Sequence, residues 1–348
     1  MKKMKFLFYV MLVMSFVIAG CSSSSNSTSG NKDEGGNSKS SSITIKFGHS
    51  SAPNSARDLG AQKFKEVVEA ETDGQVKVEI YPASQLGNPT EIVQGVQMGN
   101  IEMVISPTSF MGGFQPLITL LDIPFLMPKE KEKLLSLQDS DAMRQLLDQT
   151  ESVGIKALGI WHTGYKQFTG PKALNTPEAF KGLKFRAMPS PVIFEQFKTL
   201  GASPTDLPFA ETYNALQTGT INGQENPLDT TYDMKLHEVQ EVTTLTDHGV
   251  LDQLILVNKT FYDGLDQSIK DAMQKGFEAG RNVTVEKTYE NIENVRKTME
   301  ASGMKFVEIS DDERKVFVEE MQAVRDFYVK EFGDEGKKLL EAIEKAIE

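Results

Sequence analysis

The hydrophobic pattern of this chain switches repeatedly between the two-residue period of a strand and the three- to four-residue period of a helix. Strand-like alternation over 43–47 is followed by a helical pattern over 60–70 and by a second strand-like segment over 76–80. A helix over 89–98 and a buried strand over 102–105 come next. Strands that alternate with helices in this order predict an α/β fold with mainly parallel sheets.

The central part of the chain continues this alternation. Strands are expected over 155–161 and 182–186, and helices are expected over 191–200 and 209–218. In open α/β sheets, ligands bind at the carboxyl ends of the strands. Polar residues that follow a strand, such as those at 106–109, are therefore candidates for a binding site.

The C-terminal third has a helical pattern. Apolar residues recur at steps of three and four over 265–304, which predicts either one long helix bent near Gly280 or two shorter helices that break at Ala279 and Gly280. Two amphipathic helices follow over 311–332 and 335–343, and we expect them to be purely structural.

The N-terminus has the features of a secretory signal. Three lysines precede an apolar run over 6–18, which is too short to span a membrane but suits the hydrophobic region of a signal peptide. The only cysteine, Cys21, follows Ile-Ala-Gly, and this sequence resembles the lipobox of bacterial lipoproteins. We therefore expect residues 1–20 to be a lipoprotein signal peptide and Cys21 to carry the lipid that anchors the protein to the cell membrane.

Composition and charge limit the classes of partner. Residues 21–42 hold the lipidated cysteine and a Ser- and Gly-rich tether that cannot bury enough apolar surface to fold. The remaining 43–348 exceeds what one hydrophobic core usually serves, so we expect two domains. A net charge of -12 argues against nucleic acid and anionic membrane surfaces as partners. Cations inside a cleft can still bind an anion, because salt screens distant charges within about 8 to 10 Å.

The sequence lacks the motifs that mark a catalytic or metal site. Its four histidines show no metal-ligand spacing, and one cysteine beside a cleavage site cannot serve a zinc site. The nucleophile elbow, the phosphate-binding loop and the dinucleotide-binding glycine motif are all absent. We therefore expect no enzyme activity, no metal and no cofactor.

The most informative segment is 182–228, which reads GLKFRAMPSPVIFEQFKTLGASPTDLPFAETYNALQTGTINGQENPL. Arg186 ends a short strand-like segment, where its planar guanidinium can bind both oxygens of a carboxylate. Asn226 lies in a Gly-Gln-Glu-Asn-Pro turn further along. Together the two residues predict a site for a small organic acid. The alternative is that Arg186 is a solvated surface charge, as most arginines are.

This segment resembles the solute-binding proteins of TRAP transporters, the DctP-type family. That family carries a Gly-Leu-Lys-x-Arg strand, a Gly-Ala-x-Pro-x-x-x-x-Phe segment and a Gln-Thr-Gly-x-x-x-Gly-Gln-Glu-Asn-Pro turn, found here at 182–186, 201–209 and 217–227. The resemblance begins near Ile45 and extends to the C-terminal helices. It includes the sequences FGHSS, YPASQLGN, QGVQMGNIEM and DIPFL in that order.

The resemblance implies an α/β, two-domain fold like that of type II periplasmic binding proteins, with a long helix that spans both domains and a ligand cleft between them. Domain I would comprise 43–163 and 252–291, and domain II would comprise 164–251 and 292–348. Closure of the domains about a hinge would capture the ligand.

The resemblance also implies a function. The chain would be the extracytoplasmic receptor of a TRAP-type secondary transporter, a monomer that delivers an organic anion to one small and one large membrane subunit. A C4-dicarboxylate is favoured, and a sugar acid such as a uronate or aldonate, or a keto or hydroxy acid, is the alternative ligand. A ligand-binding module for a sensor kinase or chemoreceptor is the alternative function, because it would need the same cleft.

Residue roles follow where this chain matches the family. Arg186 would bind the carboxylate, Asn226 would orient the ligand and Phe209 would form an apolar wall. The family often has a second arginine where this chain has Lys166, which would therefore contact a second carboxylate or be an ordinary surface lysine. The remaining candidates lie at strand ends or on aromatic walls: His49, Ser50, Asn88, Ser106, Ser109, Trp161 and Tyr232.

Three of these candidates carry alternatives or consequences of their own. His49 could instead be a local structural donor, and Trp161 could belong to the core. The loop 106–109 lacks the carboxylate that the sialic-acid binders of the family carry there, which disfavours a large amino sugar as the ligand.

Overall fold

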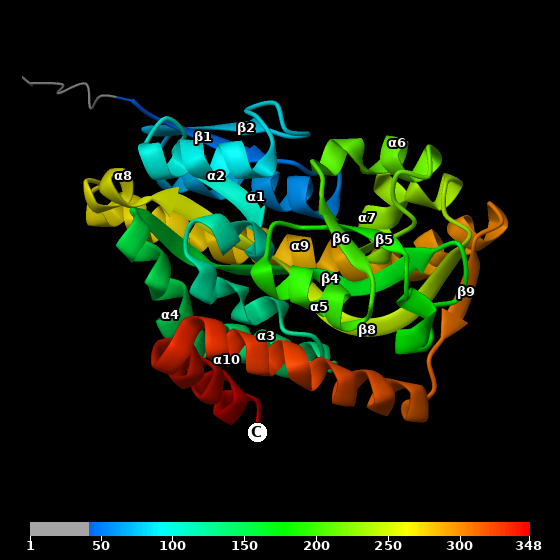
Figure 1. The fold of residues 1–348 in the computed structure, drawn as a ribbon. Coiled ribbons are helices and arrows are strands. Elements are labelled where there is room, and N and C mark those ends of the chain that lie inside the picture. Colours follow the sequence, from blue (N-terminus) through cyan, green and yellow to red (C-terminus); the bar gives the residue numbers. More distant parts are fainter. Residues whose placement is uncertain (1–41) are drawn as a thin grey trace, which may run out of the picture. The chain divides into compact units, whose positions relative to one another are not determined.

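The computed structural model describes residues 42–348, and all of them belong to one compact unit (Figure 1). The predicted signal peptide, Cys21 and the tether up to residue 41 lie outside the described residues. Those three expectations, like the boundaries of the two domains, stay predictions.

A mixed seven-stranded sheet forms the centre of the molecule. Its strands lie in the order β2, β1, β3, β8, β4 and β7, and β9 pairs with β8. The bounds are β1 (Ile43–His49), β2 (Val76–Tyr81), β3 (Met103–Pro107), β4 (Ile155–Gly170), β7 (Gln224–Asn226), β8 (Val242–Asn258) and β9 (Lys305–Glu308). The β1 strand is parallel to β2 and β3, whereas the pairs β3–β8, β8–β4 and β4–β7 are antiparallel. The expectation of mainly parallel sheets is therefore wrong for this half of the sheet.

Two long antiparallel strands, β4 and β8, pair from Ile155 opposite Asn258 to Gly170 opposite Val242. The β4 strand continues well beyond the predicted end at residue 161, and β8 was not predicted at all. Both segments bury polar side chains, including Lys166 and His248, so their sequences do not show the apolar alternation of an ordinary strand. The sheet reaches the binding region through these two strands.

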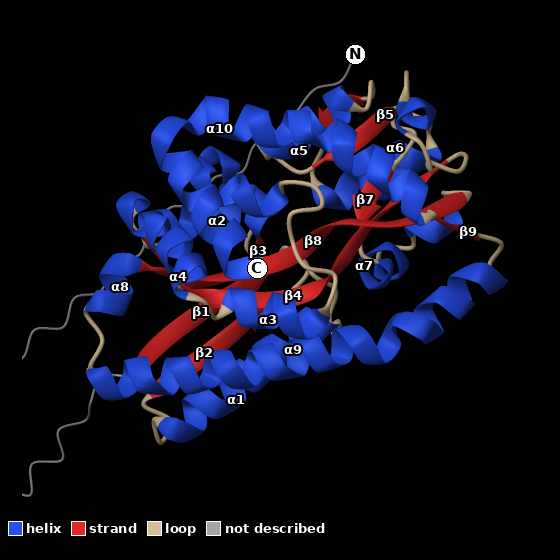
Figure 2. Cartoon of the chain, turned by 90° about the horizontal axis from the view of Figure 1, so that it is seen from below, coloured by secondary structure: helices blue, strands red, loops and turns tan. Residues whose placement is uncertain are grey.

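The helix α9 (Gln267–Ala301) is continuous and packs along α1 (Ala56–Glu71). Figure 2 shows it running along one face of the sheet. Gly280 produces no break and instead allows close packing: a Cβ there would lie 2.4 Å from Cζ2 of Trp161 and 2.8 Å from the carbonyl oxygen of Gly60. The alternative of two shorter helices is wrong.

The C-terminal helix α10 (Asp311–Ile347) contains one non-helical residue, Gly333, with φ of 60°. This bend confirms the two predicted C-terminal helices on either side of it. Only glycine adopts this backbone conformation without strain. The α10 helix packs against α3 (Lys131–Gln138), α4 (Asp141–Asp148) and α5 (Pro191–Thr199).

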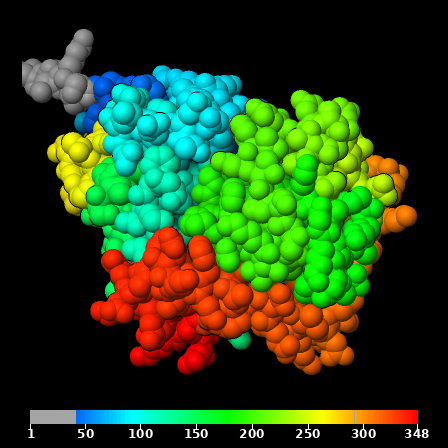
Figure 3. Space-filling model, viewed as in Figure 1, coloured from blue at the N-terminus to red at the C-terminus, as the bar shows by residue number. Residues whose placement is uncertain are grey.

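Shorter elements complete the fold. A two-stranded parallel sheet consists of β5 (Lys184–Ala187) and β6 (Ser203–Asp206). The remaining helices are α2 (Pro89–Met98), α3 (Lys131–Gln138), α4 (Asp141–Asp148), α5 (Pro191–Thr199), α6 (Thr212–Gln217), α7 (Leu228–Asp233) and α8 (Lys259–Asp263). In Figure 3, residues near 100 (cyan) and residues near 200 (green) meet on one face, with α10 (orange to red) beneath both.

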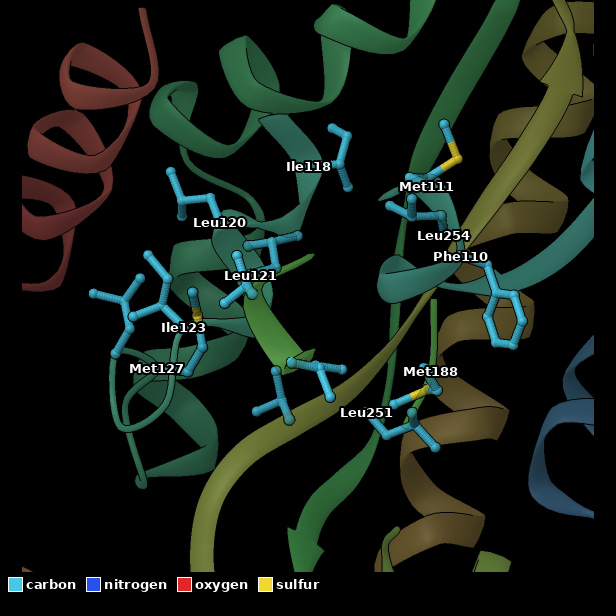
Figure 4. Packing of buried hydrophobic residues seen from close by; sticks show 14 of the residues in the cluster. Phe110, Met111, Ile118, Leu120, Leu121, Ile123, Met127, Met188, Leu251 and Leu254 are labelled. Atoms are coloured by element: carbon cyan, nitrogen blue, oxygen red, sulfur yellow. The ribbon is translucent and has the colours of Figure 1, made fainter. Parts of the chain in front are cut away.

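Two large clusters form the core. One surrounds Trp161 between α1, α9 and the sheet, and the other joins the sheet to α5 and α10. Figure 4 shows part of the second cluster, including Phe110, Met188 and Leu251. These three residues also line the cavity described next, so the cavity borders directly on the packed core.

Candidate functional site

A small cavity of about 280 Å³ brings four of the sequence candidates together, namely Ser50, Arg186, Phe209 and Asn226. The cavity is lined by Ser50, Arg57, Pro89, Pro107, Phe110, Arg186, Met188, Phe209, Asn226, Thr230 and Leu251. No acidic side chain is among these described lining residues.

Arg186 is held on β5, where its backbone N–H donates to the carbonyl oxygen of Gly223 at 3.0 Å. Its side chain is only 2% exposed, and its guanidinium carbon lies 5.5 Å from the ring centre of Phe209. Its Nε donates to the carbonyl oxygen of Leu207 at 3.3 Å, and its guanidinium forms no ion pair with any acid in residues 42–348. Burial lowers the pKa of Arg186 to about 10, so it stays a cation at neutral pH.

Asn226 ends the short strand β7, which pairs with β4 at Gln167. The side chain is 2% exposed, and its amide donates to the side-chain oxygen of Gln224. Pro227 follows as the N-cap of α7, which begins at Leu228. Asn226 and Arg186 both line the cavity.

A second arginine, Arg57, lines the cavity and was missed by the sequence analysis. It lies in the first turn of α1, which begins after the N-cap Ser55. Its side chain is 5% exposed, and Nη2 donates to the Thr230 hydroxyl at 2.8 Å. Its Nε is buried and has no hydrogen-bond partner in the described part of the chain. The sequence signal was an arginine near the end of the first strand, but the predicted helix began three residues too late to include it.

Lys166 lies behind the cavity and not on its wall. It is fully buried on β4, and its Nζ lies 2.7 Å from Oε1 of Glu225. The other oxygen of Glu225 accepts hydrogen bonds from His248 at 2.8 Å and from Gln196 at 2.7 Å. Burial alone would raise the pKa of Glu225, but Lys166 and His248 hold it well below its usual range. The charge of Lys166 is therefore compensated within the protein.

Two candidates at strand ends, Asn88 and His49, serve local structure. Asn88 caps α2 by accepting from the Glu91 backbone, and Glu91 in turn accepts from the Asn88 backbone. His49 Nε2 lies 3.1 Å from Oδ1 of Asp58, and Asp58 also accepts from the Asn54 backbone. His49 thereby ties the end of β1 to the start of α1.

The serines after β3 also point to structure. The Ser109 hydroxyl donates to Oδ1 of Asp122 at 2.7 Å, and the Ser106 hydroxyl donates to the Pro107 carbonyl oxygen at 3.4 Å. Burial raises the pKa of Asp122, although Lys166 and the Ser109 hydrogen bond oppose this shift. Neither serine is among the lining residues.

The two remaining aromatic candidates also lie away from the cavity. Trp161 is fully buried in the core, and its Nε1 donates to the carbonyl oxygen of Phe277 at 3.1 Å. Tyr232 borders a separate, larger surface cavity of about 740 Å³ and stacks on His237.

Comparison with known proteins decides the family. The model of bacterial extracellular solute-binding protein, family 7 (DctP), matches residues 47–331. This chain belongs to the DctP family. It is 34% identical to the C4-dicarboxylate-binding periplasmic protein DctP of Rhodobacter capsulatus, covering 84% of this chain and 88% of that protein. It is 32% identical to the 2,3-diketo-L-gulonate-binding periplasmic protein YiaO of Escherichia coli, covering 86% and 91%.

A solved structure agrees with this assignment. A TRAP periplasmic solute-binding protein from Desulfovibrio salexigens with bound orotic acid superposes with a TM-score of 0.85 at 32% identity, covering 88% of this chain and 98% of that one. The predicted two-domain α/β fold of periplasmic binding proteins is therefore confirmed. DctP-family proteins are extracytoplasmic solute-binding proteins, which favours binding over catalysis. Within residues 42–348, no helix has the length and apolar character needed to cross a bilayer.

Proposed function

We propose that this DctP-family chain is the receptor of a TRAP-type secondary transporter and captures a small organic acid, with a C4-dicarboxylate favoured. The observation that carries this proposal is the buried Arg186 guanidinium, which lines a small cavity without an ion-pair partner in the described residues. An uncompensated buried charge is costly, and a ligand carboxylate would compensate it. The C4-dicarboxylate-binding relative from R. capsulatus and the solved complex with orotic acid support an acidic ligand.

Each polar group in the cavity has a role in this proposal. Arg186 binds a carboxylate through two parallel hydrogen bonds, and Asn226 fixes the orientation of the ligand through its amide. Phe209 supplies an apolar wall beside the guanidinium, and the Ser50 hydroxyl donates or accepts a further hydrogen bond.

Closure of the cavity is the proposed mechanism of capture. With the predicted domain boundaries, Ser50, Arg57 and Phe110 come from domain I, whereas Arg186, Asn226 and Thr230 come from domain II. A ligand that contacts both domains only in the closed state shifts the equilibrium towards that state. The membrane subunits would then recognise the closed receptor, which is held near them by the lipid on Cys21.

The proposal is tested by a thermal-shift screen of residues 21–348 with Cys21→Ser, unfolded and refolded to remove bound ligand. The screen contains C4-dicarboxylates, keto and hydroxy acids, uronates and aldonates, because the E. coli relative is named for a sugar acid. A ligand at about 100 times its dissociation constant stabilises by about 2.7 kcal/mol, which raises the midpoint by several degrees.

Arg186→Gln provides the decisive comparison. We expect it to weaken binding of the selected acid at least about tenfold, because one hydrogen bond to a charged group is worth roughly 1.5–3 kcal/mol. Arg296→Gln is the matched control, since Arg296 lies on the surface of α9 and pairs with Glu300. A screen without any acid-dependent shift, or equal affinity in Arg186→Gln, would contradict the proposal. Uptake of the acid by cells that express the receptor and both membrane subunits tests delivery.

A further inference from the structure

We infer that Arg57 binds a second carboxylate of the ligand and thereby selects dicarboxylic acids over monocarboxylic acids. This inference rests on the proposed function, and it assigns the selection to a residue on α1 in place of Lys166. Three observations support it. The cavity holds two buried cations, Arg57 has hydrogen-bond donors without a partner in the described residues, and Lys166 is already paired with Glu225.

The charge balance of the cavity requires two negative charges. Arg186 and Arg57 both line it, and both side chains are at least 95% buried. Within residues 42–348 neither guanidinium lies within 4 Å of a carboxylate oxygen. A monocarboxylate would compensate one of these cations and leave the other buried and unpaired. A short dicarboxylate would compensate both.

The nearby acids do not supply the missing charge. Asp206 and Glu225 both oppose the burial that lowers the pKa of Arg186, but neither forms an ion pair with its guanidinium. Asp206 is exposed on β6, and the two oxygens of Glu225 already contact Lys166 and His248. Asp233 feels the charge of Arg57, yet it is exposed and lies on the wall of the larger surface cavity. The protein therefore leaves both cavity arginines for the ligand.

Arg57 has bonding capacity to spare. Its single side-chain hydrogen bond joins Nη2 to the hydroxyl of Thr230, and its buried Nε has no partner in the described chain. A neutral hydroxyl is a weaker acceptor than a carboxylate, so an incoming carboxylate would be the preferred partner. Because Arg57 belongs to predicted domain I and Thr230 to predicted domain II, this carboxylate would also link the two domains.

Lys166 does not fill this role, although it stands where the family often has its second arginine. Its ammonium is fully buried against Glu225 and is absent from the cavity wall formed by the described residues. Using it for a ligand would require breaking the ion pair with Glu225. Arg57 needs no such exchange.

The test compares two acids with the same number of carbon atoms, succinate and butyrate, by isothermal titration calorimetry on residues 21–348 with Cys21→Ser. We expect this protein to prefer succinate by roughly 10- to 100-fold. Arg57→Gln should weaken succinate to near the level of butyrate and change butyrate less than threefold. Arg186→Gln should weaken both acids, and Arg296→Gln should change neither.

Two further measurements separate selection from structure. Without ligand, Arg57→Gln should keep or raise the thermal midpoint, because it removes an uncompensated buried charge; a structural role of the Thr230 contact would lower it. Arg57→Lys keeps the charge but loses the planar fork, so it should retain part of the preference for succinate.

The outcomes also separate this inference from the proposed function. Tight butyrate binding that depends on Arg186 but not on Arg57 would overturn the inference and leave the receptor function intact. Equal weakening of both acids by Arg57→Gln would also overturn it. A folded protein that binds no acid of the screen would overturn the proposed function and this inference together.

Discussion

The ion pair between Lys166 and Glu225 leads to the strongest stability prediction. In Glu225→Gln the side chain keeps its shape, but Lys166 loses the carboxylate oxygen 2.7 Å from its Nζ while staying fully buried. Removing one partner of a buried ion pair costs about 3–5 kcal/mol, because the other charge is left uncompensated. His248 and Gln196 also lose a charged acceptor.

This cost corresponds to a large change in thermal stability. An unfolding entropy of about 2.1 cal/mol/K per residue means that one kcal/mol shifts the midpoint of a folded chain of this size by roughly 1.5 °C, so Glu225→Gln should lower it by roughly 5–8 °C. Denaturant unfolding followed by circular dichroism gives the free energy itself. Glu66→Gln is the matched control: Glu66 pairs with Lys63 on the surface of α1, and such pairs are worth about 0–1 kcal/mol.

A double-mutant cycle isolates the pair. Lys166→Met combined with Glu225→Gln removes both charges, so it should be considerably more stable than Glu225→Gln alone. A Glu225→Gln variant within 1 kcal/mol of the unmodified protein would refute the reasoning. Simple addition of the two single effects would show that the two side chains do not interact.

Two more predictions test the same network and the helix packing. The pKa of Glu225 is lowered in the folded protein, so its ionised form stabilises the fold above the unfolded-state pKa of about 4.3. This contribution decreases as the pH falls below that value. Unfolding free energies measured at pH 3, 4, 5 and 7 should therefore fall less steeply with decreasing pH in Glu225→Gln than in the unmodified protein. Gly280→Ala should lower the free energy of unfolding by about 1–3 kcal/mol, because the new Cβ would lie 2.4 Å from the Trp161 ring. Thermal unfolding measures this loss. Gly113→Ala is the control, because no atom lies within 4 Å of a Cβ at that position. Unchanged midpoints for both glycine variants would contradict the packing argument.

The sequence predicted those elements whose hydrophobic period is regular. The strands and helices up to residue 105 appear close to the expected positions, and the long helix α9 and the bend at Gly333 do as well. The main failure was β8. Nearly all residues of β8 are buried, and threonine, histidine and aspartate are among them. The strand therefore lacks the alternation of apolar and polar residues that predicts a strand from sequence.

The sequence candidates Arg186 and Asn226, which both line the cavity, lie on strands that are close both in sequence and in space. Arg186 and Asn226 lie on neighbouring short strands, since the Arg186 backbone bonds to Gly223 close to Asn226. Arg57 was missed because it is distant from both in sequence, and only the folded chain brings it within hydrogen-bond distance of Thr230 on α7. Periodicity contains no information on such a contact between separate segments.

The two cationic positions show why residue type alone does not locate a binding group. Lys166 lies where the resemblance to the family predicts a second arginine, but Glu225 on the neighbouring strand β7 forms an ion pair with it. Arg57 matches no quoted motif, and its buried guanidinium meets only the Thr230 hydroxyl among the described side chains. A buried charge is costly unless an opposite charge lies beside it. A buried charge without a partner in the protein therefore indicates where a charged ligand would bind. In this cavity that charge belongs to Arg186 and Arg57, and a dicarboxylate is the ligand that would balance both.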